Sequence, residues 1–243
     1  MIRLNRFLAH CGVASRRQCD LLIDRGEVSI NGKTIRELGF QIDEERDRVY
    51  CHGKPVAMQA EKMIMLNKPS GYLVTASDPH GRRTVFDLLI GIRERFFSVG
   101  RLDHDTTGLL LLTTNGKLSH RLTHPKYHVR KTYHAVVQGV PTEDELEQLR
   151  TGIKLEDGIT APARARVIRK RRGTSWLEIK IFEGRKRQVR RMAEAIGHPV
   201  IDLKRTAIDW LTLGKLPVGK WRDLTSEEIK KLKNRVNYQE ESS

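Results

Sequence analysis

The segment from Val99 to Gly108 contains the residues best suited to chemistry. Asp103 lies at its centre, between a strand-like stretch that ends at Val99 and the apolar run Leu109–Leu112. Gly100 and Gly108 permit tight backbone turns, so a loop held by two buried elements would present the Asp103 carboxylate as a base or a nucleophile. An Asp before threonines also caps backbone amides, and the segment taken alone favours that structural role.

The His104-Asp105 pair suggests a metal site, but it lacks the helical or hairpin spacing of metal ligands. The cysteines at positions 11, 19 and 51 match neither a zinc-ligand pattern nor a disulfide framework. We therefore expect reduced thiols and no bound metal.

The charge of the chain points to a polyanionic partner. Lys and Arg outnumber Asp and Glu by 45 to 30, which gives a formal charge of +15 over 243 residues. The excess is spread along the whole chain, as suits a surface that binds phosphates. Residues 1–6 carry charge where a signal peptide needs an apolar stretch, and no later run approaches the length of a membrane span. We expect a cytoplasmic protein.

The patterns over residues 1–53 predict a small domain of helices and strands. Apolar residues recur at helical spacing over 3–11, and Ser15 with Gln18 forms the capping box of a second helix that stops at Gly26. A short strand over 27–30 is followed by the hairpin dipeptide Asn31-Gly32, and a last strand around 48–51 closes the predicted unit. Residues 54–60 lack periodicity and contain a proline, so we place a linker there.

Residues 61–233 intersperse short strands and helices without regular βαβ alternation, which predicts an α+β domain. The apolar run 109–112 is typical of a strand covered on both faces. Capping pairs at Thr84/Asp87 and Thr142/Glu145 begin helices, and 164–169 with 176–182 predicts a long hairpin. An amphipathic helix follows through Val189 to Ile196. The polar segment 234–243 is expected to be a frayed tail.

The N-terminal segments resemble the S4 RNA-binding domain. The similarity lies in Arg3-Leu4-Asn5-Arg6-Phe7-Leu8, in Ala14-Ser15-Arg16-Arg17 and in Gly26-Glu27-Val28-Ser29-Ile30-Asn31-Gly32-Lys33. It implies that cationic side chains around the second helix grip the RNA backbone. The alternative is that they are ordinary solvated charges. The side chains concerned are Arg3, Arg6, Arg16, Arg17 and Lys33.

The larger part of the chain resembles the pseudouridine synthases of the small-ribosomal-subunit type and their relatives. The string Gly100-Arg101-Leu102-Asp103, followed by Thr106-Thr107-Gly108 and the leucine run, is similar to the signature of that family. The similarity extends in family order over nearly all of residues 61–200 and implies a mixed, mostly antiparallel sheet with peripheral helices. It continues through Leu66–Gly71, Gly81–Val85, His124-Pro125, Lys131-Thr132-Tyr133 and Glu183–Met192.

This resemblance assigns roles to particular residues. It implies that Asp103 is the catalytic carboxylate, that Tyr133 stacks on the target base, and that Arg190 forms an ion pair with Asp103. The reaction would cut uracil from ribose C1′, turn it and rejoin it through C5. Asp103 would act as a base toward C2′ or as a nucleophile, and both routes stay open. Because substrate and product are isomers, no cofactor is required.

Other cations match places where the family contacts RNA, although solvated surface is the alternative for each. Arg101 is expected to hold a phosphate while the target nucleotide is everted. The remaining candidates are Lys68, Arg82, Arg83, Lys131, Arg185 and Arg187.

Two segments, Gly81–Leu89 and His124–Tyr127, are more similar to the family members that modify large-subunit RNA than to the small-subunit enzyme. We therefore expect the substrate to be 23S rRNA, either free or in an assembly intermediate. We expect the protein to act as a monomer. The alternatives are a 16S rRNA synthase and a noncatalytic RNA-binding factor in ribosome assembly. A metal-dependent nuclease is a third hypothesis. The set of Asp103, Tyr133 and Arg190 argues against a noncatalytic role, because binding alone does not need that combination.

Overall fold

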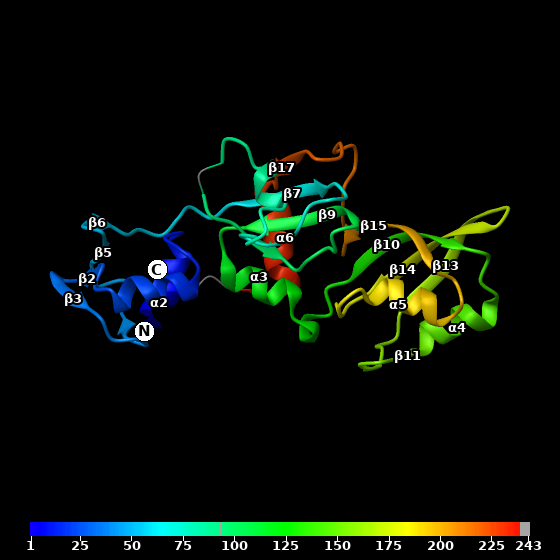
Figure 1. Ribbon diagram of the computed structural model, residues 1–243, viewed down its shortest axis with the longest axis horizontal. Helices are drawn as coiled ribbons and strands as arrows, with labels where there is room; N and C mark the ends of the chain where they lie inside the picture. Colours follow the sequence, from blue (N-terminus) through cyan, green and yellow to red (C-terminus); the bar gives the residue numbers. More distant parts are fainter. Residues whose placement is uncertain (93, 239–243) are drawn as a thin grey trace.

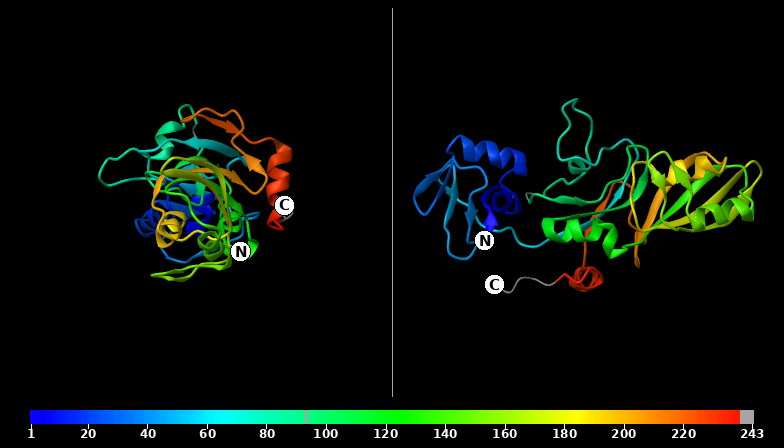
Figure 2. Two further views of the ribbon diagram at one scale, coloured as in Figure 1. Left: turned by 90° about the vertical axis from the view of Figure 1, so that its right-hand side faces the viewer. Right: turned by 90° about the horizontal axis from the view of Figure 1, so that it is seen from below.

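The computed structural model describes residues 1–92 and 94–238. A small N-terminal domain lies at one end of an elongated molecule, and a larger domain built on a nine-stranded sheet forms the rest (Figure 1). The two further views place the hairpin of β13 (Arg164–Arg171) and β14 (Thr174–Ile181) at the opposite end from the N-terminal domain (Figure 2). Within the described ranges, no helix has the length and apolar character needed to cross a membrane.

The N-terminal domain confirms the predicted helices and hairpin. Ser15 and Gln18 form the predicted capping box of the second helix. Asn31 and Gly32 both have positive φ values, 50° and 81°, as a two-residue hairpin turn requires. The two helices are α1 (Leu4–His10) and α2 (Arg16–Asp24). Strands β1 (Ile2–Arg3) and β4 (Gln41–Ile42) pair with each other. A separate four-stranded sheet has the order β3 (Lys33–Ile35), β2 (Val28–Ile30), β5 (Val49–Cys51), β6 (Lys54–Pro55).

The connection between the domains begins later than the predicted linker over residues 54–60. Lys54 and Pro55 form strand β6 and pair with Cys51 and Tyr50 on the edge of the small sheet. An edge strand accepts proline because its outward side needs no N–H donor. Val56 still packs against the core of the N-terminal domain. The segment without helix or strand therefore covers 56–62.

The sheet of the larger domain is mixed and mostly antiparallel, and the predicted α+β class is confirmed. One parallel pairing, between β9 (Thr107–Thr113) and β15 (Val200–Ile208), joins its two halves. The strands run in the order β13, β14, β10 (Lys131–Gln138), β15 (Val200–Ile208), β9 (Thr107–Thr113), β7 (Met63–Lys68), β17 (Trp221–Asp223), with β8 (Phe97–Val99) on β9 and β16 (Leu211–Thr212) on β15. A separate small hairpin consists of β11 (Lys154–Leu155) and β12 (Gly158–Ile159).

Helices and loops cover the sheet and bury its central strands. Every side chain in Leu109–Leu112 is buried, as predicted for a strand covered on both faces. The Thr84/Asp87 capping box is present, but it begins a 3₁₀ turn and not a longer helix. The helices are η1 (Val85–Leu88), α3 (Gly116–Thr123), η2 (Pro125–Tyr127), α4 (Glu143–Thr151), α5 (Gln188–Ala195) and α6 (Ser226–Arg235).

The C-terminal segment corrects the expectation of a polar tail over residues 234–243. Helix α6 continues to Arg235, and Val236 is fully buried in the core beside it. The hydroxyl of Tyr238 accepts a hydrogen bond from the side-chain amide of Asn115 at 2.8 Å. Residues 234–238 therefore pack against the larger domain, while 239–243 lie outside the described residues.

Candidate active site

A cavity of about 320 Å³ opens where the two halves of the large sheet meet. Asp103 and Tyr133 both line it, Asp103 from the loop between β8 and β9 and Tyr133 from β10. Strand β15 contributes Arg205, and the turn before α5 contributes Glu183 and Arg187. The cavity thus combines a carboxylate, an aromatic ring and several cations.

The junction of β9 and β15 depends on Gly108. The two strands pair in parallel over Thr107 with Lys204 and Gly108 with Arg205. Gly108 has a φ of +106°, and a Cβ atom there would lie 2.2 Å from the carbonyl oxygen of Arg205. Only glycine permits both this conformation and this approach. The glycine that follows the Asp103 loop therefore brings β15 to the edge of the cavity.

Lys68 binds the main chain of the Asp103 loop. Its side chain is 0% exposed, and its Nζ donates to the carbonyl oxygens of Pro69, Asp103, His104 and Thr106 at 2.9–3.3 Å. An ammonium has three N–H donors, so at least one of these hydrogen bonds is shared. Burial lowers the pKa of Lys68 to about 8, against the opposing effects of the nearby carboxylates. The prediction that Lys68 contacts the RNA backbone is wrong, because the loop encloses its charge.

Arg190 binds the same loop at Asp105. Its Nη2 lies 3.2 Å from the Asp105 carboxylate and donates to the Asp105 carbonyl oxygen at 3.2 Å. The predicted ion pair of Arg190 with Asp103 is therefore corrected: the guanidinium reaches the loop two residues further along. Burial alone would raise the pKa of Asp105, but the hydrogen bond from Arg187 and the charges of Arg190 and Arg187 outweigh it and lower the pKa.

None of these contacts engages the Asp103 carboxylate. The side chain is half-buried in the cavity wall, and no hydrogen bond or salt bridge engages its carboxylate within residues 1–92 and 94–238. Lys68 and the Thr106 amide contact only its main-chain carbonyl oxygen. In the same ranges, no three His, Cys, Asp or Glu side chains are grouped as a metal site would need. The loop is fixed through its backbone, and Asp103 lines the cavity.

The neighbouring wall contains Tyr133, the buried Arg205 and the half-buried Lys131. The ring of Tyr133 packs against the cores on both sides of the junction. Its hydroxyl accepts a hydrogen bond from Nη1 of Arg205 at 3.5 Å. Lys131 also lines the cavity and donates to the carbonyl oxygen of Phe182 at 2.8 Å. Burial, followed by the charge of Arg205, lowers the pKa of Lys131 to about 8.

The sequence of residues 62–195 matches the profile of the RNA pseudouridylate synthase family. The chain belongs to this family. Residues 2–49 match the S4 domain. The pseudouridylate synthase is therefore an isomerase that acts on RNA, preceded by an RNA-binding module, and the resemblance stated from the sequence is confirmed.

Relatives of known name align with almost the whole of this chain. It is 45% identical to ribosomal large subunit pseudouridine synthase B of Bacillus subtilis (strain 168), over 96% of both chains. The protein of that name from Pseudomonas aeruginosa is 38% identical and is matched over 96% of this chain and 62% of its own length. A crystal structure of a pseudouridylate synthase superposes with a TM-score of 0.68 at 34% identity, covering 96% of this chain and all of the other.

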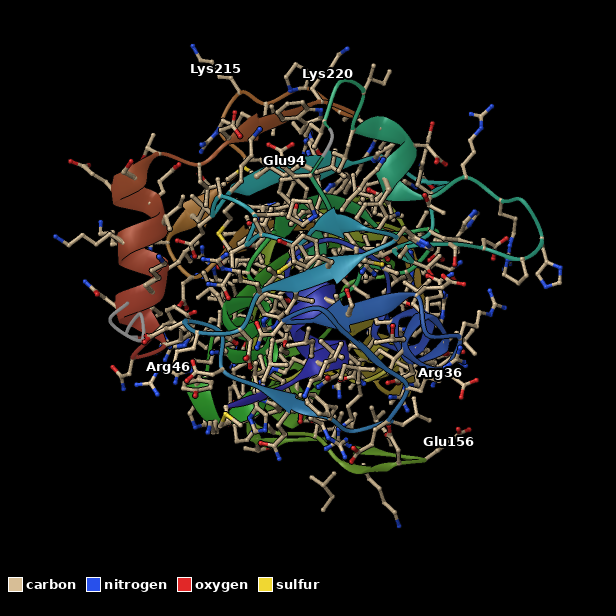
Figure 3. All side chains as sticks on the ribbon, turned by 90° about the vertical axis from the view of Figure 1, so that its left-hand side faces the viewer. Arg36, Arg46, Glu94, Glu156, Lys215 and Lys220 are labelled. Carbon is tan, nitrogen blue, oxygen red and sulfur yellow. The ribbon has the colours of Figure 1, made fainter. Side chains whose placement is uncertain are left out.

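The other predicted RNA contacts of the pseudouridylate synthase fall into separate groups. Arg101, Lys131 and Arg187 line the cavity. The guanidinium of Arg82 donates two hydrogen bonds to the carboxylate of Asp78. The neighbouring Arg83 is exposed. The S4-domain candidates lie outside the cavity lining and are all exposed; they are Arg3, Arg6, Arg16, Arg17 and Lys33. A view onto that end shows charged side chains projecting from the molecule, with Arg36 and Arg46 labelled (Figure 3).

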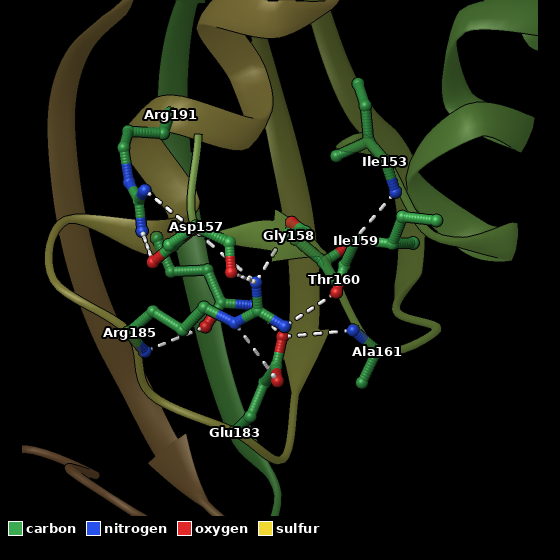
Figure 4. Close-up of polar contacts among 10 residues, drawn as sticks. Ile153, Asp157, Gly158, Ile159, Thr160, Ala161, Glu183, Arg185 and Arg191 are labelled. Atoms are coloured by element: carbon green, nitrogen blue, oxygen red, sulfur yellow. Dashed lines mark hydrogen bonds and ion pairs between the residues drawn. The ribbon is translucent and has the colours of Figure 1, made fainter. Parts of the chain in front are cut away.

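Arg185 also lines the cavity and is engaged by the protein, and its assignment as a contact to RNA stays a prediction. Its guanidinium donates to the carbonyl oxygens of Gly158 at 3.0 Å and Ile159 at 2.6 Å, and pairs with Asp157 and Glu183 (Figure 4). These bonds fasten the β11–β12 hairpin to the turn that precedes α5. A phosphate would have to break several of them to bind Arg185.

Sequence reasoning missed Arg205 and the role of Asp105. Arg205 does have a signal in the sequence: it lies at an inward position of β15, between the buried Leu203 and Ala207 in period-two register. An arginine at such a position must be enclosed by the protein. Asp105 was considered only as a metal ligand, although it contacts two arginines of the segment at the start of α5.

Proposed function

We propose that this pseudouridylate synthase isomerises a uridine of 23S rRNA, with Asp103 as its catalytic carboxylate. Two relatives that align over nearly the whole chain carry the name of a large-subunit enzyme, which supports the choice of RNA. The observation that carries the assignment of Asp103 is its uncommitted carboxylate in the wall of the cavity.

The arrangement of the loop suits a carboxylate that must react. Lys68 and Arg190 bind the main-chain carbonyl oxygens of residues 103–106, so they fix the loop without neutralising the Asp103 carboxylate directly. A half-buried carboxylate that no other side chain engages is free to react with a bound substrate. Placed beside the sugar of an everted nucleotide, it can take the proton from C2′ or attack C1′.

Tyr133 supplies the surface on which the freed base turns. Its ring forms part of the cavity wall, and stacking of a base on an aromatic side chain contributes about 1–3 kcal/mol. Arg101, Lys131 and Arg187 line the same cavity and provide cations for the phosphates that flank the target. Arg190 acts in this proposal as a positioning residue, through its bonds to Asp105.

The proposal extends to the organisation and surroundings of the enzyme. Residues 1–53 would bind RNA beside the target while residues 61–233 perform the reaction, with the chain acting as a monomer in the cytoplasm on ribosomal RNA or an assembly intermediate. Because the reaction only rearranges bonds within one nucleotide, we propose that it needs no cofactor.

Mapping pseudouridines in a deletion strain tests both substrate and catalytic residue. The strain is complemented with the native gene, with Asp103→Asn or with Asp202→Asn, an exposed carboxylate on β15 that serves as the matched control. We expect one 23S site to lose its pseudouridine on deletion and to regain it with the native and Asp202→Asn genes only. Loss of a 16S site would overturn the choice of RNA. Restoration by Asp103→Asn, or no lost site in either RNA, would overturn the catalytic assignment.

A further inference from the structure

We propose that Arg205 is a positioning residue for the reaction: its buried guanidinium orients the hydroxyl of Tyr133 for removal of the C5 proton, the step that completes isomerisation. The inference rests on the proposed function, in which the freed base turns against Tyr133, and adds a proton-transfer task for the hydroxyl of that residue. It assigns a task to a cation that lines the cavity but cannot be reached as a surface contact for phosphate.

The burial of Arg205 requires an explanation. The side chain is 3% exposed, and no salt bridge compensates its charge within the described residues. Its Nε donates to the carbonyl oxygen of Leu109 at 2.7 Å, whereas Nη2 is buried without a hydrogen-bond partner. A buried guanidinium with one unpaired nitrogen and no carboxylate is costly. A cation kept at that cost, in the wall of a reactive cavity, is suited to a functional role.

The contact with Tyr133 fixes the direction of the phenolic proton. Nη1 of Arg205 lies 3.5 Å from Oη of Tyr133. A guanidinium has donors only, so the phenolic oxygen must accept in this contact and its own O–H points elsewhere. The bond to Leu109 holds the guanidinium against β9, the strand that follows the Asp103 loop. Contacts of this kind are often long in the free enzyme and shorten when substrate is bound.

The oriented hydroxyl matters in the last chemical step. After the uracil has rejoined the sugar through C5, that carbon carries both C1′ and its original proton. Joining through C5 has left a double bond between N1 and C6. The C5–H bond then breaks and its electron pair forms the C5=C6 double bond, while the pair of the N1=C6 double bond moves onto N1, which takes up a proton. The C5 proton passes to the Tyr133 oxygen while the hydroxyl proton moves on to solvent. Substrate and product remain isomers, and no other reactant is consumed.

The first measurement is tritium release from a 23S rRNA transcript that carries [5-³H]uridine. Arg205→Met should lower kcat about 10- to 100-fold, the effect of losing one hydrogen bond from a charged group, and should leave KM unchanged. Arg205→Lys should recover part of the rate. Arg150→Met is the matched control, because Arg150 also bonds a strand carbonyl oxygen through Nε but lies on α4, outside the cavity lining. Native kcat in Arg205→Met, or an equal loss in Arg150→Met, would overturn the inference.

A double-mutant cycle separates this role from a purely structural one. If Arg205 acts through the Tyr133 hydroxyl, Arg205→Met should cost little further rate in a Tyr133→Phe background. An equal loss in both backgrounds would overturn the inference.

A transcript that contains 5-fluorouridine provides an independent readout, because its C5 has no proton to lose. Arg205→Met should form the rearranged fluorinated nucleoside at the native rate while its tritium release is slow. Slowing of both reactions would place Arg205 at an earlier step and contradict the proposal. This assay also decides the matter if Tyr133→Phe is inactive. If the native enzyme itself releases no tritium from ribosomal transcripts, the proposed function fails and the inference falls with it.

Discussion

The ammonium of Lys68 donates to the main-chain carbonyl oxygen of Asp103 at 3.1 Å and leaves the carboxylate of that residue untouched. Two side chains, Lys68 and Arg190, bind the carbonyl oxygens of the four residues 103–106 between them. The Asp103 loop is therefore held by cations that act on its backbone.

Replacing Lys68 by methionine should unfold the loop around Asp103. Four carbonyl oxygens would lose a buried charged donor, and each such loss costs about 1–3 kcal/mol before relaxation. We expect a much lower melting temperature and loss of tritium release. Lys62→Met is the control, because Lys62 is partly exposed and pairs with Glu94, a contact worth about 1 kcal/mol or less. Equal melting temperatures for the two variants would contradict the account.

Lys131 should make stability depend on alkaline pH. Its pKa is about 8 in the folded protein, against an ordinary value of 10.5 that applies to the unfolded chain. Below pH 8 both states hold the proton, and between pH 8 and 10.5 only the unfolded state does. The free energy of unfolding of the native protein, relative to Lys131→Met, should therefore rise through this window. Denaturant titrations at several pH values measure it, and a difference that stays flat or falls would refute the depressed pKa.

Gly108→Ala should separate the two halves of the sheet. The new Cβ would lie 2.2 Å from the carbonyl oxygen of Arg205, and the φ of +106° is strained for alanine. Gly219→Ala is the matched control, because Gly219 has a φ of +78° and nothing within 4 Å of the added carbon. We expect the control to cost about 1 kcal/mol and Gly108→Ala to cost several times more. Similar melting temperatures would show that the close approach of β15 is unimportant.

Arg190 should be coupled in energy to Asp105 more strongly than to Asp103. The structure pairs its guanidinium with both the carboxylate and the carbonyl oxygen of Asp105. Double-mutant cycles with Arg190→Met, Asp105→Asn and Asp103→Asn, read by denaturant unfolding, should give a coupling energy of about 1 kcal/mol or more for the first pair and near zero for the second. The reverse order would restore the ion pair predicted from the sequence.

The sequence predicted those features that depend on neighbours along the chain. Each of these features is determined by residues that lie close together in the sequence. They are the capping pairs at Ser15/Gln18 and Thr84/Asp87, the turn at Asn31-Gly32 and the buried run 109–112. Strand β15 was missed because lysine, arginine and aspartate interrupt its apolar pattern, and its partner β9 lies almost a hundred residues earlier.

The same reasoning explains the errors in the site. Nothing local distinguishes Lys68 from an exposed cation, because it is enclosed by carbonyl oxygens up to 38 residues away in the sequence. Arg190 was matched to the correct loop but to the wrong carboxylate, since two aspartates lie two residues apart and only the folded geometry separates them. The placement of Asp103 and Tyr133 in one cavity is as the sequence led us to expect.

The most direct test of the central claim is the single-turnover rate of purified Asp103→Asn on a 23S rRNA transcript, measured together with its affinity for the same RNA. We expect native affinity and a native melting temperature with no detectable pseudouridine, because the loop is held by its backbone and only the reactive oxygen is lost. A rate within about tenfold of the native enzyme, a difference of less than about 1.4 kcal/mol in the barrier, would contradict it.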